Sequence, residues 1–366
     1  MSQTNGSSGG PGGRGPYTPQ EIDVPLSRFA IFLVCTVNAG ADSRADVRDA
    51  LADVGELIKS VGFRDRDGSL ACTVGIGSRV WESLTGRAQP AELHPFREFF
   101  GRTHSAPATP GDLLFHIRSG RQDICFEFER LLLDSLGDGV RVVDEVSGFR
   151  YFDTRDLLGF VDGTANPVGP ELPEATVVGD EDPDFAGGSY VVVQKYVHPL
   201  PDWQSLPTEQ QESIMGRTKA DDVELDDAES GQKSHKTLTT ITDDDGEHDI
   251  VRDNMPFGSP AKGEYGTYFI GYSRYLWVIE QMLERMFIGD PPGLHDQLLD
   301  FSTAETGTTF FAPSATLLQS LADVEDVEDA DAAGDADADA ADDGAAAADS
   351  GAGNDPSLGI GSLKTS

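Results

Sequence analysis

The sequence predicts an α+β protein made of two tandem ferredoxin-like units with antiparallel sheets. Residues 27–150 alternate apolar runs of strand length with segments of helical period, in the order β-α-β-β-α-β that defines the ferredoxin-like arrangement. Residues 151–318 repeat this order. The composition changes at both ends of the chain. This change predicts a disordered arm at 1–26, an acidic Ala/Asp-rich linker at 319–354 and a separate terminal peptide at 355–366.

The first unit contains four predicted strands and two predicted helices. The run from Phe29 to Val37 is continuously apolar, which suits the buried centre of a sheet. Residues 44–62 place Val47 and Leu51 at helical spacing, with polar residues on the opposite side. The remaining predicted elements are strands at 71–76, 112–118 and 140–143 and a helix at 121–136.

The second unit shows the same succession. Its predicted elements are a strand at 189–197, a helix at 207–217, strands at 236–242 and 264–272, a helix at 275–288 and a strand at 308–312. The helix at 275–288 carries Leu276, Ile279 and Leu283 on one face, which we expect to point into the core.

The charge of the chain limits its partners. The 366 residues carry 64 acidic and 27 basic side chains, for a formal net charge of -37. Such a chain repels nucleic acid and anionic membranes, so we expect neither as a partner. A mostly disordered acidic protein and a protein adapted to a salt-rich cytoplasm would both have this composition. The periodic apolar segments favour the second explanation, a halophilic source.

Cysteine spacing and hydropathy exclude further classes of protein. The three cysteines lie far apart and form no CxxC pair for zinc, and Cys35 and Cys72 sit in apolar runs as small buried hydrophobes. The first 20 residues lack the apolar core of a secretory signal, and no apolar run approaches the ~20 residues of a membrane span. We therefore expect a soluble, cytoplasmic protein.

One motif near the midpoint carries chemical information. The stretch from Gly159 to Pro167 places Asp162 on a glycine-flanked turn without Lys or Arg. Turn formation alone explains Asp-Gly and Asn-Pro dipeptides. The pattern Gly-x-x-Asp-Gly, followed by Thr and Asn-Pro, also resembles the distal signature of dye-decolorizing peroxidases of the B-type subgroup. These are haem enzymes with a duplicated ferredoxin-like fold. The resemblance implies that Asp162 is a distal acid and that each chain binds one haem b. The absence of a CxxCH motif predicts non-covalent binding.

Two downstream segments extend the resemblance. His235, in Gly-Gln-Lys-Ser-His-Lys, matches the position of the family's proximal histidine, which implies that it is the axial ligand of the haem iron. The segment Arg-Asp-Asn-Met-Pro-Phe-Gly that begins at Arg252 matches the family's distal arginine segment. The resemblance therefore implies a distal cation at Arg252 and an amide at Asn254 that holds a distal water or the peroxide.

Further matches imply the remaining contacts of the cofactor. Arg217 lies in a segment that resembles the one whose arginine reaches a haem propionate. The segment Asp-Gln-Leu-Leu-Asp-Phe-Ser implies a carboxylate partner for the Nδ1–H of His235, with Asp296 as our choice and Asp300 as the alternate. Phe269 either lines the apolar face of the haem or belongs to the core.

The resemblance implies reduction of hydrogen peroxide through an oxo-ferryl intermediate and oxidation of one-electron donors such as dyes or phenolics. Ala165 departs from the subgroup, which is often acidic there, so a metal-oxidation role through that position is in doubt, although Glu224 remains at another commonly acidic place. Large donors are expected to pass electrons through surface Tyr or Trp. The tryptophans are Trp81, Trp203 and Trp277. A non-catalytic haem-storage cargo or a deferrochelatase-like protein is the alternative function.

The C-terminal segment has a composition of its own. Residues 323–349 contain 12 acidic and no basic residues, which predicts a flexible tether. Large apolar residues then reappear at Leu358, Ile360 and Leu363, although a Gly/Ser-rich terminus can also be a frayed end. This segment resembles the cargo-loading peptide that docks enzymes inside encapsulin shells. The resemblance implies an encapsulin shell protein as partner and a position inside the nanocompartment. A homo-oligomeric cargo, which we expect, would gain avidity from its many peptides.

Overall fold

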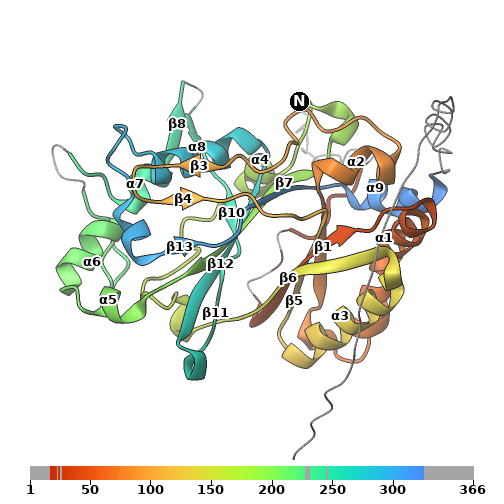
Figure 1. Cartoon of the computed structure of the whole chain (residues 1–366), viewed down its shortest axis with the longest axis horizontal. Helices are drawn as coiled ribbons and strands as arrows, with labels where there is room; N and C mark the ends of the chain where they lie inside the picture. Colours follow the sequence, from red (N-terminus) through yellow and green to blue (C-terminus); the bar gives the residue numbers. More distant parts are fainter. Residues whose placement is uncertain (1–16, 23, 25–26, 227–230, 245, 325–366) are drawn as a thin grey trace, which may run out of the picture. The chain divides into compact units, whose positions relative to one another are not determined.

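The computed structural model describes residues 17–22, 24, 27–226, 231–244 and 246–324, and it confirms the predicted α+β class (Figure 1). The strands are β1 (Phe29–Val37), β2 (Ala71–Ile76), β3 (Phe99–Phe100), β4 (Ser105–Ala106), β5 (Leu113–Ser119), β6 (Val140–Phe149), β7 (Ser189–Val197), β8 (Ile241–Asp243), β9 (Gly246–His248), β10 (Val251–Arg252), β11 (Met255–Ser259), β12 (Glu264–Ser273), β13 (Thr303–Ala304) and β14 (Thr308–Ala312).

The helices cover the sheet or connect its strands. They are α1 (Ala41–Gly62), α2 (Ser78–Thr85), α3 (Gln122–Leu136), α4 (Glu171–Thr176), α5 (Leu200–Gln204), α6 (Thr208–Met215), α7 (His235–Thr239), α8 (Leu276–Phe287) and α9 (Ala315–Gln319), together with several short 3-10 helices, among them η6 (Gln297–Phe301) and η7 (Ser320–Asp323). None of the helices in the described part of the chain has both the length and the hydropathy needed to cross a membrane.

Strand order confirms the duplicated ferredoxin-like topology. In the first half the order is β6-β1-β5-β2. The first strand of the unit, β1, therefore lies between its fourth strand, β6, and its third strand, β5. The second half has the same order, β14-β7-β12, with β10 and β11 both paired to the far side of β12. All of these pairings are antiparallel. The two halves form one continuous sheet because β14 also pairs with β2, where Phe311 lies opposite Ile76.

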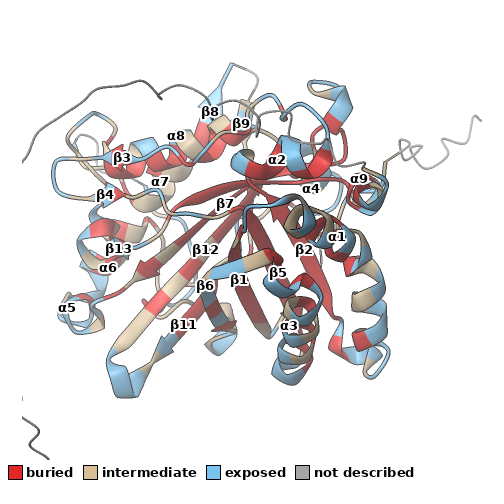
Figure 2. Cartoon of the chain, turned by 45° about the vertical axis from the view of Figure 1, so that its right-hand side comes forward, coloured by how far each residue is buried: buried red, intermediate tan, exposed pale blue. Residues whose placement is uncertain are grey.

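The central strands are buried on both faces, which explains their continuous apolar runs. On β1, Leu33 and Cys35 point toward the core that α1 and α3 cover. The alternate residue Phe32 points the other way, into a second core that it shares with β12. Its ring stacks on Tyr268 with 4.2 Å between the ring centroids. Figure 2 shows the result, with buried strands beneath helices whose outer faces are exposed.

One predicted element is wrong. Residues 236–242 do not form a strand; most of them belong to α7, and only Ile241–Asp243 is extended. Helix α7 begins there because the hydroxyl of Ser234 accepts the backbone N–H of Thr237 at 3.4 Å, which caps the helix. The second strand of the second half is instead β10 together with β11, and this strand carries Arg252.

Segments near both ends contact the fold more extensively than the sequence predicted. Residues 17–22 fall within the predicted arm, yet Gln20 Nε2 donates to the carbonyl oxygens of Val74 (2.8 Å) and Pro313 (2.9 Å). Leu321 falls within the predicted linker but is fully buried in η7. Leu358, Ile360 and Leu363 of the predicted cargo peptide lie outside the described residues.

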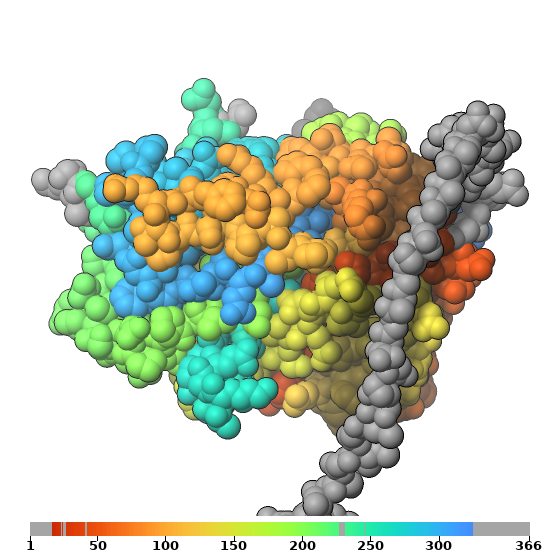
Figure 3. All heavy atoms as spheres, viewed as in Figure 1, coloured from red at the N-terminus to blue at the C-terminus, as the bar shows by residue number. Residues whose placement is uncertain are grey.

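The β3–β4 hairpin reaches across to the second half. Figure 3 shows the orange segment that contains β3 and β4 beside the blue segment that contains β13, although they are far apart in the sequence. Gly101, at the tip of this hairpin, packs so closely that an added Cβ would lie 2.1 Å from the carbonyl oxygen of Phe287 at the end of α8. The hairpin is therefore held firmly against the second half.

Candidate active site

A large cavity lies in the second half, between the β7–β12 face of the sheet and the helices α7, α8 and η6. It contains about 1570 Å³ of empty space, including its open mouth. Phe269 is one of its apolar lining residues, together with Leu158, Val161, Ile250, Ile279, Met282, Leu283, Met286, Leu298 and Leu299.

His235 enters the cavity from the first residue of α7. Its Nδ1 lies 2.6 Å from Oδ2 of Asp296, whose carboxylate is fully buried. The other oxygen of Asp296 accepts the backbone N–H of Leu298 at 2.9 Å, which fixes the carboxylate. Among the described residues, none forms a hydrogen bond to Nε2 of His235. The structure thus pairs His235 with Asp296; Asp300, the alternate, contacts two other histidines.

Asp162 lies at the cavity on a turn that depends on its glycines. Gly159 has φ 95° and Gly163 has φ 82°, values at which a residue with a Cβ would be strained. A Cβ at position 159 would also lie 2.4 Å from Cε of Lys219. The backbone N–H of Asp162 donates to the carbonyl oxygen of Thr154 at 2.9 Å. The motif therefore orients the Asp162 carboxylate toward the cavity.

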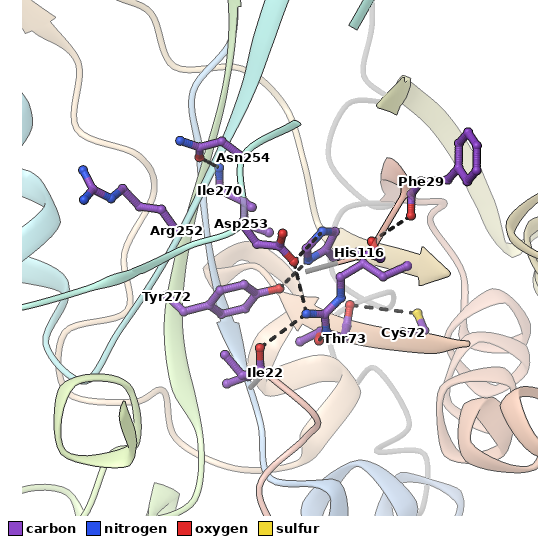
Figure 4. Close-up of polar contacts among 12 residues, drawn as sticks. Ile22, Phe29, Cys72, Thr73, His116, Arg252, Asp253, Asn254, Ile270 and Tyr272 are labelled. Atoms are coloured by element: carbon purple, nitrogen blue, oxygen red, sulfur yellow. Dashed lines mark hydrogen bonds and ion pairs between the residues drawn. The ribbon is translucent and has the colours of Figure 1, made fainter. Parts of the chain in front are cut away.

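Arg252 and Asn254 line the same cavity because side chains alternate along an extended chain. Asp253, which lies between Arg252 and Asn254 in sequence, is turned to the opposite side of this segment and is buried. Figure 4 shows Arg252 pointing away from it. Nδ2 of Asn254 donates to Oδ2 of Asp162 at 3.1 Å, and Oδ1 of Asn254 accepts the backbone N–H of Ile270 at 3.1 Å. The amide is thus oriented by the backbone and holds the carboxylate of Asp162.

Asn166 is a positioning residue that sequence reasoning missed. Its Oδ1 accepts the backbone N–H of Arg252 at 3.0 Å, and its Nδ2 donates to the carbonyl oxygen of Arg252 at 2.6 Å. The Asn166 amide thus bonds both backbone polar groups of Arg252, as a neighbouring β-strand would. These two bonds fix Arg252 relative to the motif that contains Asp162. Nε of Arg252 is buried and has no hydrogen-bond partner among the described residues. Arg252 thus lines the cavity with a guanidinium that keeps unused hydrogen-bonding capacity.

A buried polar network lies behind this wall of the cavity (Figure 4). Oδ2 of Asp253 accepts a hydrogen bond from Nη1 of Arg118 at 3.3 Å, and Nδ1 of His116 lies 2.9 Å from the hydroxyl of Tyr272. Burial raises the pKa of Asp253, an effect that the Arg118 charge opposes. Burial and the same Arg118 charge both keep the pKa of His116 well below its usual range. The network anchors the segment that carries Arg252.

The same arginine connects this wall to the N-terminal segment. Nη2 of Arg118 donates to the carbonyl oxygen of Glu21 at 2.6 Å, and Nη1 donates to that of Ile22 at 3.3 Å. Glu21 and Ile22 therefore supply two acceptors to a side chain that is almost fully buried.

The mouth of the cavity is lined by paired charges. Arg217, the predicted propionate partner, lines the cavity, where its Nε donates to Asp222 (2.7 Å) and its Nη1 to Glu224 (2.8 Å). Lys236 is a second cation at the cavity, which the sequence did not reveal, and its Nζ lies 2.7 Å from Glu224. Two basic residues are thus held at the mouth by acidic neighbours.

Asp156 is a second carboxyl group that the sequence did not single out. It lines the cavity, and its Oδ1 accepts the backbone N–H of Phe160 at 2.9 Å. Burial raises the pKa of Asp156 to about 7; the bond from Phe160 opposes this shift, and the nearby charge of Asp162 adds to it. The cavity therefore contains a carboxyl group that titrates near neutral pH.

Comparisons with known proteins match this arrangement. The families described as "Dyp-type peroxidase, N-terminal" and "Dyp-type peroxidase, C-terminal" match residues 19–150 and 153–317. A dye-decolorizing peroxidase of Mycobacterium tuberculosis is 57% identical over 302 residues, which are 82% of this chain and 90% of that protein. The protein is therefore an oxidoreductase of the peroxidase class. More specifically, the chain belongs to the Dyp-type peroxidase family.

Two solved structures have the same fold. A variant of DypB from Rhodococcus jostii RHA1, in complex with heme, is 54% identical and superimposes with a TM-score of 0.80 over 82% of this chain and 98% of that chain. The encapsulated DyP-type peroxidase from Mycobacterium smegmatis is 53% identical and has a TM-score of 0.80 over 82% of this chain and 97% of that chain.

Proposed function

We propose that this peroxidase holds haem b non-covalently in the cavity of its second half and reduces hydrogen peroxide at the expense of one-electron donors such as dyes or phenolics. The observation that carries the proposal is that His235, Asp162, Arg252 and Asn254, predicted from separate motifs, all line one cavity. The chemistry of this donor set fits haem, since it combines an imidazole, apolar walls and basic residues at the mouth. When bound, the haem iron supplies the redox centre at which peroxide is reduced.

His235 is the residue that would bind the haem iron. Its Nδ1 bond to Asp296 fixes the tautomer that leaves Nε2 unprotonated, which is the form that binds a metal. The buried carboxylate also makes the imidazole a stronger donor. Arg217 and Lys236 are the proposed partners of the haem propionates, which would compete with Asp222 and Glu224 for these cations.

Asp162 and Arg252 are the proposed catalytic residues. The Asp162 carboxylate accepts the proton of one peroxide oxygen and returns it to the other, so that the distant oxygen leaves as water. The Arg252 guanidinium stabilises the negative charge that develops on the leaving oxygen. Asn254 is proposed to hold a distal water or the peroxide, and its bond to Asp162 supports an additional positioning role.

The test compares Arg252→Leu and Asp162→Asn with wild-type protein loaded with haem. We expect Arg252→Leu to lower kcat/KM for peroxide by about 10²–10³, the usual effect of removing one transition-state donor. Arg130→Leu, an exposed residue of α3, is the matched control and should behave as wild type. Full activity in both cavity variants would refute the catalytic assignment.

The same experiment addresses the alternatives. A haem-storage or deferrochelatase-like protein needs the ligand His235 but gives no role to an acid, an amide and an arginine around one cavity. Peroxide-dependent dye turnover that Arg252→Leu abolishes, while haem content stays at one per chain, supports the peroxidase. Absence of peroxide-dependent dye turnover in the haem-loaded wild-type protein, or loss of iron from intact porphyrin, supports an alternative.

The proposal extends to packaging inside an encapsulin shell in the cytoplasm. It rests on the spacing of Leu358, Ile360 and Leu363 and on the solved relative that is described as encapsulated. Co-expression with the shell protein tests it. The full chain should co-sediment with assembled shells, and a variant lacking residues 355–366 should not, while it keeps its peroxidase activity. Equal co-sedimentation of both would contradict the proposal. A homo-oligomeric cargo and a salt-rich source remain predictions.

A further inference from the structure

We propose a divalent transition-metal site, separate from the peroxidase cavity, formed by His104, His295 and Asp300. Nε2 of His104 lies 2.8 Å from Oδ1 of Asp300, and Nε2 of His295 lies 3.0 Å from the same oxygen. The ligand atoms of the three residues all lie within 4.8 Å of one another. None of the three lines the cavity of His235.

These distances are close to those of a bound metal. Zinc–nitrogen and zinc–oxygen bonds of ~2.0–2.1 Å in tetrahedral geometry place ligand atoms ~3.3 Å apart. The two contacts to Asp300 are already within about half an ångström of that value. The third pair, the two imidazole nitrogens, lies within 4.8 Å. Metal binding would therefore bring the two histidines closer by up to about 1.5 Å, through side-chain rotations that replace the shared hydrogen bonds by coordinate bonds. Water would complete the coordination on the exposed side, since the Asp300 side chain is 44% exposed.

The ligand types select the class of metal. Two imidazoles and one carboxylate suit Zn²⁺, Co²⁺, Ni²⁺ or Cu²⁺, whereas Mg²⁺ and Ca²⁺ prefer oxygen ligands alone. A net charge of -37 raises the local concentration of any cation. We take Zn²⁺ as the probe because it is redox-inactive and does not react with peroxide.

The elements that carry the ligands are preorganised. His104 belongs to the β3–β4 hairpin, where its carbonyl oxygen accepts the N–H of Gly101 at 2.9 Å. This hairpin lies beside the segment of His295 and Asp300 (Figure 3). The carbonyl oxygen of His295 accepts Nε2 of Gln232 at 2.9 Å. A bound metal would join the two halves of the chain next to Asp296 and should stabilise the fold.

The experiment uses haem-loaded protein, stripped of metals with a chelator and kept in excess Mg²⁺ to occupy general carboxylate sites. Calorimetric titration with Zn²⁺ should show one site per chain. His104→Gln and Asp300→Asn should each weaken this site by at least ~100-fold, because losing a ligand should exceed the 10–100-fold effect of losing a supporting contact. The matched control is His94→Gln, a histidine outside this cluster whose Nε2 lies 3.4 Å from Glu280, and it should bind Zn²⁺ as wild type does.

Thermal unfolding provides a second readout that does not depend on activity. Zn²⁺ should raise the Tm of wild-type protein and of His94→Gln but not that of His104→Gln, and an unchanged haem spectrum shows that the variants are folded. If a variant does not fold, zinc edge anomalous scattering from crystals of wild-type protein decides, since the metal must appear between the three side chains. Three results would each overturn the proposal: zinc bound at another position, equal Zn²⁺ affinity in all variants, or no Zn²⁺ binding when Mg²⁺ is in excess.

Discussion

Replacing Asp296 by Asn should weaken haem binding without disturbing the fold around it. The amide is nearly the same size and can still accept the backbone N–H of Leu298 through Oδ1. The second oxygen, which lies 2.6 Å from Nδ1 of His235, becomes an NH₂ group. Two donors would then face each other, so His235 would move its proton to Nε2, the nitrogen that should bind iron.

The size of the effect follows from the geometry. A buried hydrogen bond to a charged group contributes about 1.5–3 kcal/mol. Removing the outer partner of a metal-bound histidine usually lowers metal affinity 10–100-fold, which equals about 1.4–2.8 kcal/mol. The two estimates agree. We therefore expect haem to dissociate 10–100 times faster, and the iron reduction potential to rise because the imidazole becomes a weaker donor.

Haem transfer to excess apomyoglobin measures the dissociation rate, and a redox titration measures the potential. Asp300→Asn, with both variants free of added divalent metal, is the matched control, since Asp300 lies four residues further on, is exposed and contacts His104 and His295 instead of His235. Wild-type dissociation rate and potential in Asp296→Asn would refute the reasoning, as would an equal effect of Asp300→Asn.

Three further predictions follow from contacts near the cavity. Asn166→Ala removes both bonds to the Arg252 backbone and should lower kcat/KM for peroxide on the order of tenfold, with haem content unchanged by absorbance. In steady-state assays, Trp277→Phe should lower the rate of oxidation of a bulky dye severalfold and leave the rate for a small phenol unchanged. Trp277 is placed to pass electrons from the surface to the cavity, because it is partly exposed and its ring centroid lies 4.8 Å from that of the cavity residue His248. Asp156→Asn should stabilise the protein more, relative to wild type, as the pH rises from 4 to 8, as measured by urea unfolding. Burial raises the Asp156 pKa from 3.8 to about 7, so the free energy of unfolding of wild type falls by on the order of 4 kcal/mol over that range. The amide does not titrate, so the variant does not lose this stability. A pH-independent difference would contradict this last prediction.

Long apolar runs made most of the fold predictable. The strand from Phe29 to Val37 and the helix after it were located correctly because burial on both faces leaves a continuous apolar signal. The misplaced strand at 236–242 shows the limit of this signal. A single capping hydroxyl at Ser234 starts a helix there, and the strand that carries Arg252 is short, broken and polar at alternate positions.

The candidate site was predictable only through motifs. Asp162, Arg252 and Asn254 come from segments about 90 residues apart, and their proximity depends on pairings across the sheet that no local pattern encodes. Asp156 and Asn166 were missed for a different reason. Both have the residue types of ordinary turns, and their roles depend on burial and on the partners that the fold provides.

The N-terminal contact of Arg118 bears on how this enzyme is best produced. A recombinant chain shortened to start at β1 would leave that guanidinium without its Glu21 and Ile22 acceptors, one side chain away from Asp253 and the neighbouring Arg252. Trimming what looks like a dispensable leader could thus impair peroxide chemistry with every catalytic residue still present. Purification handles are better fused ahead of residue 17, so that Glu21 and Ile22 stay in the chain.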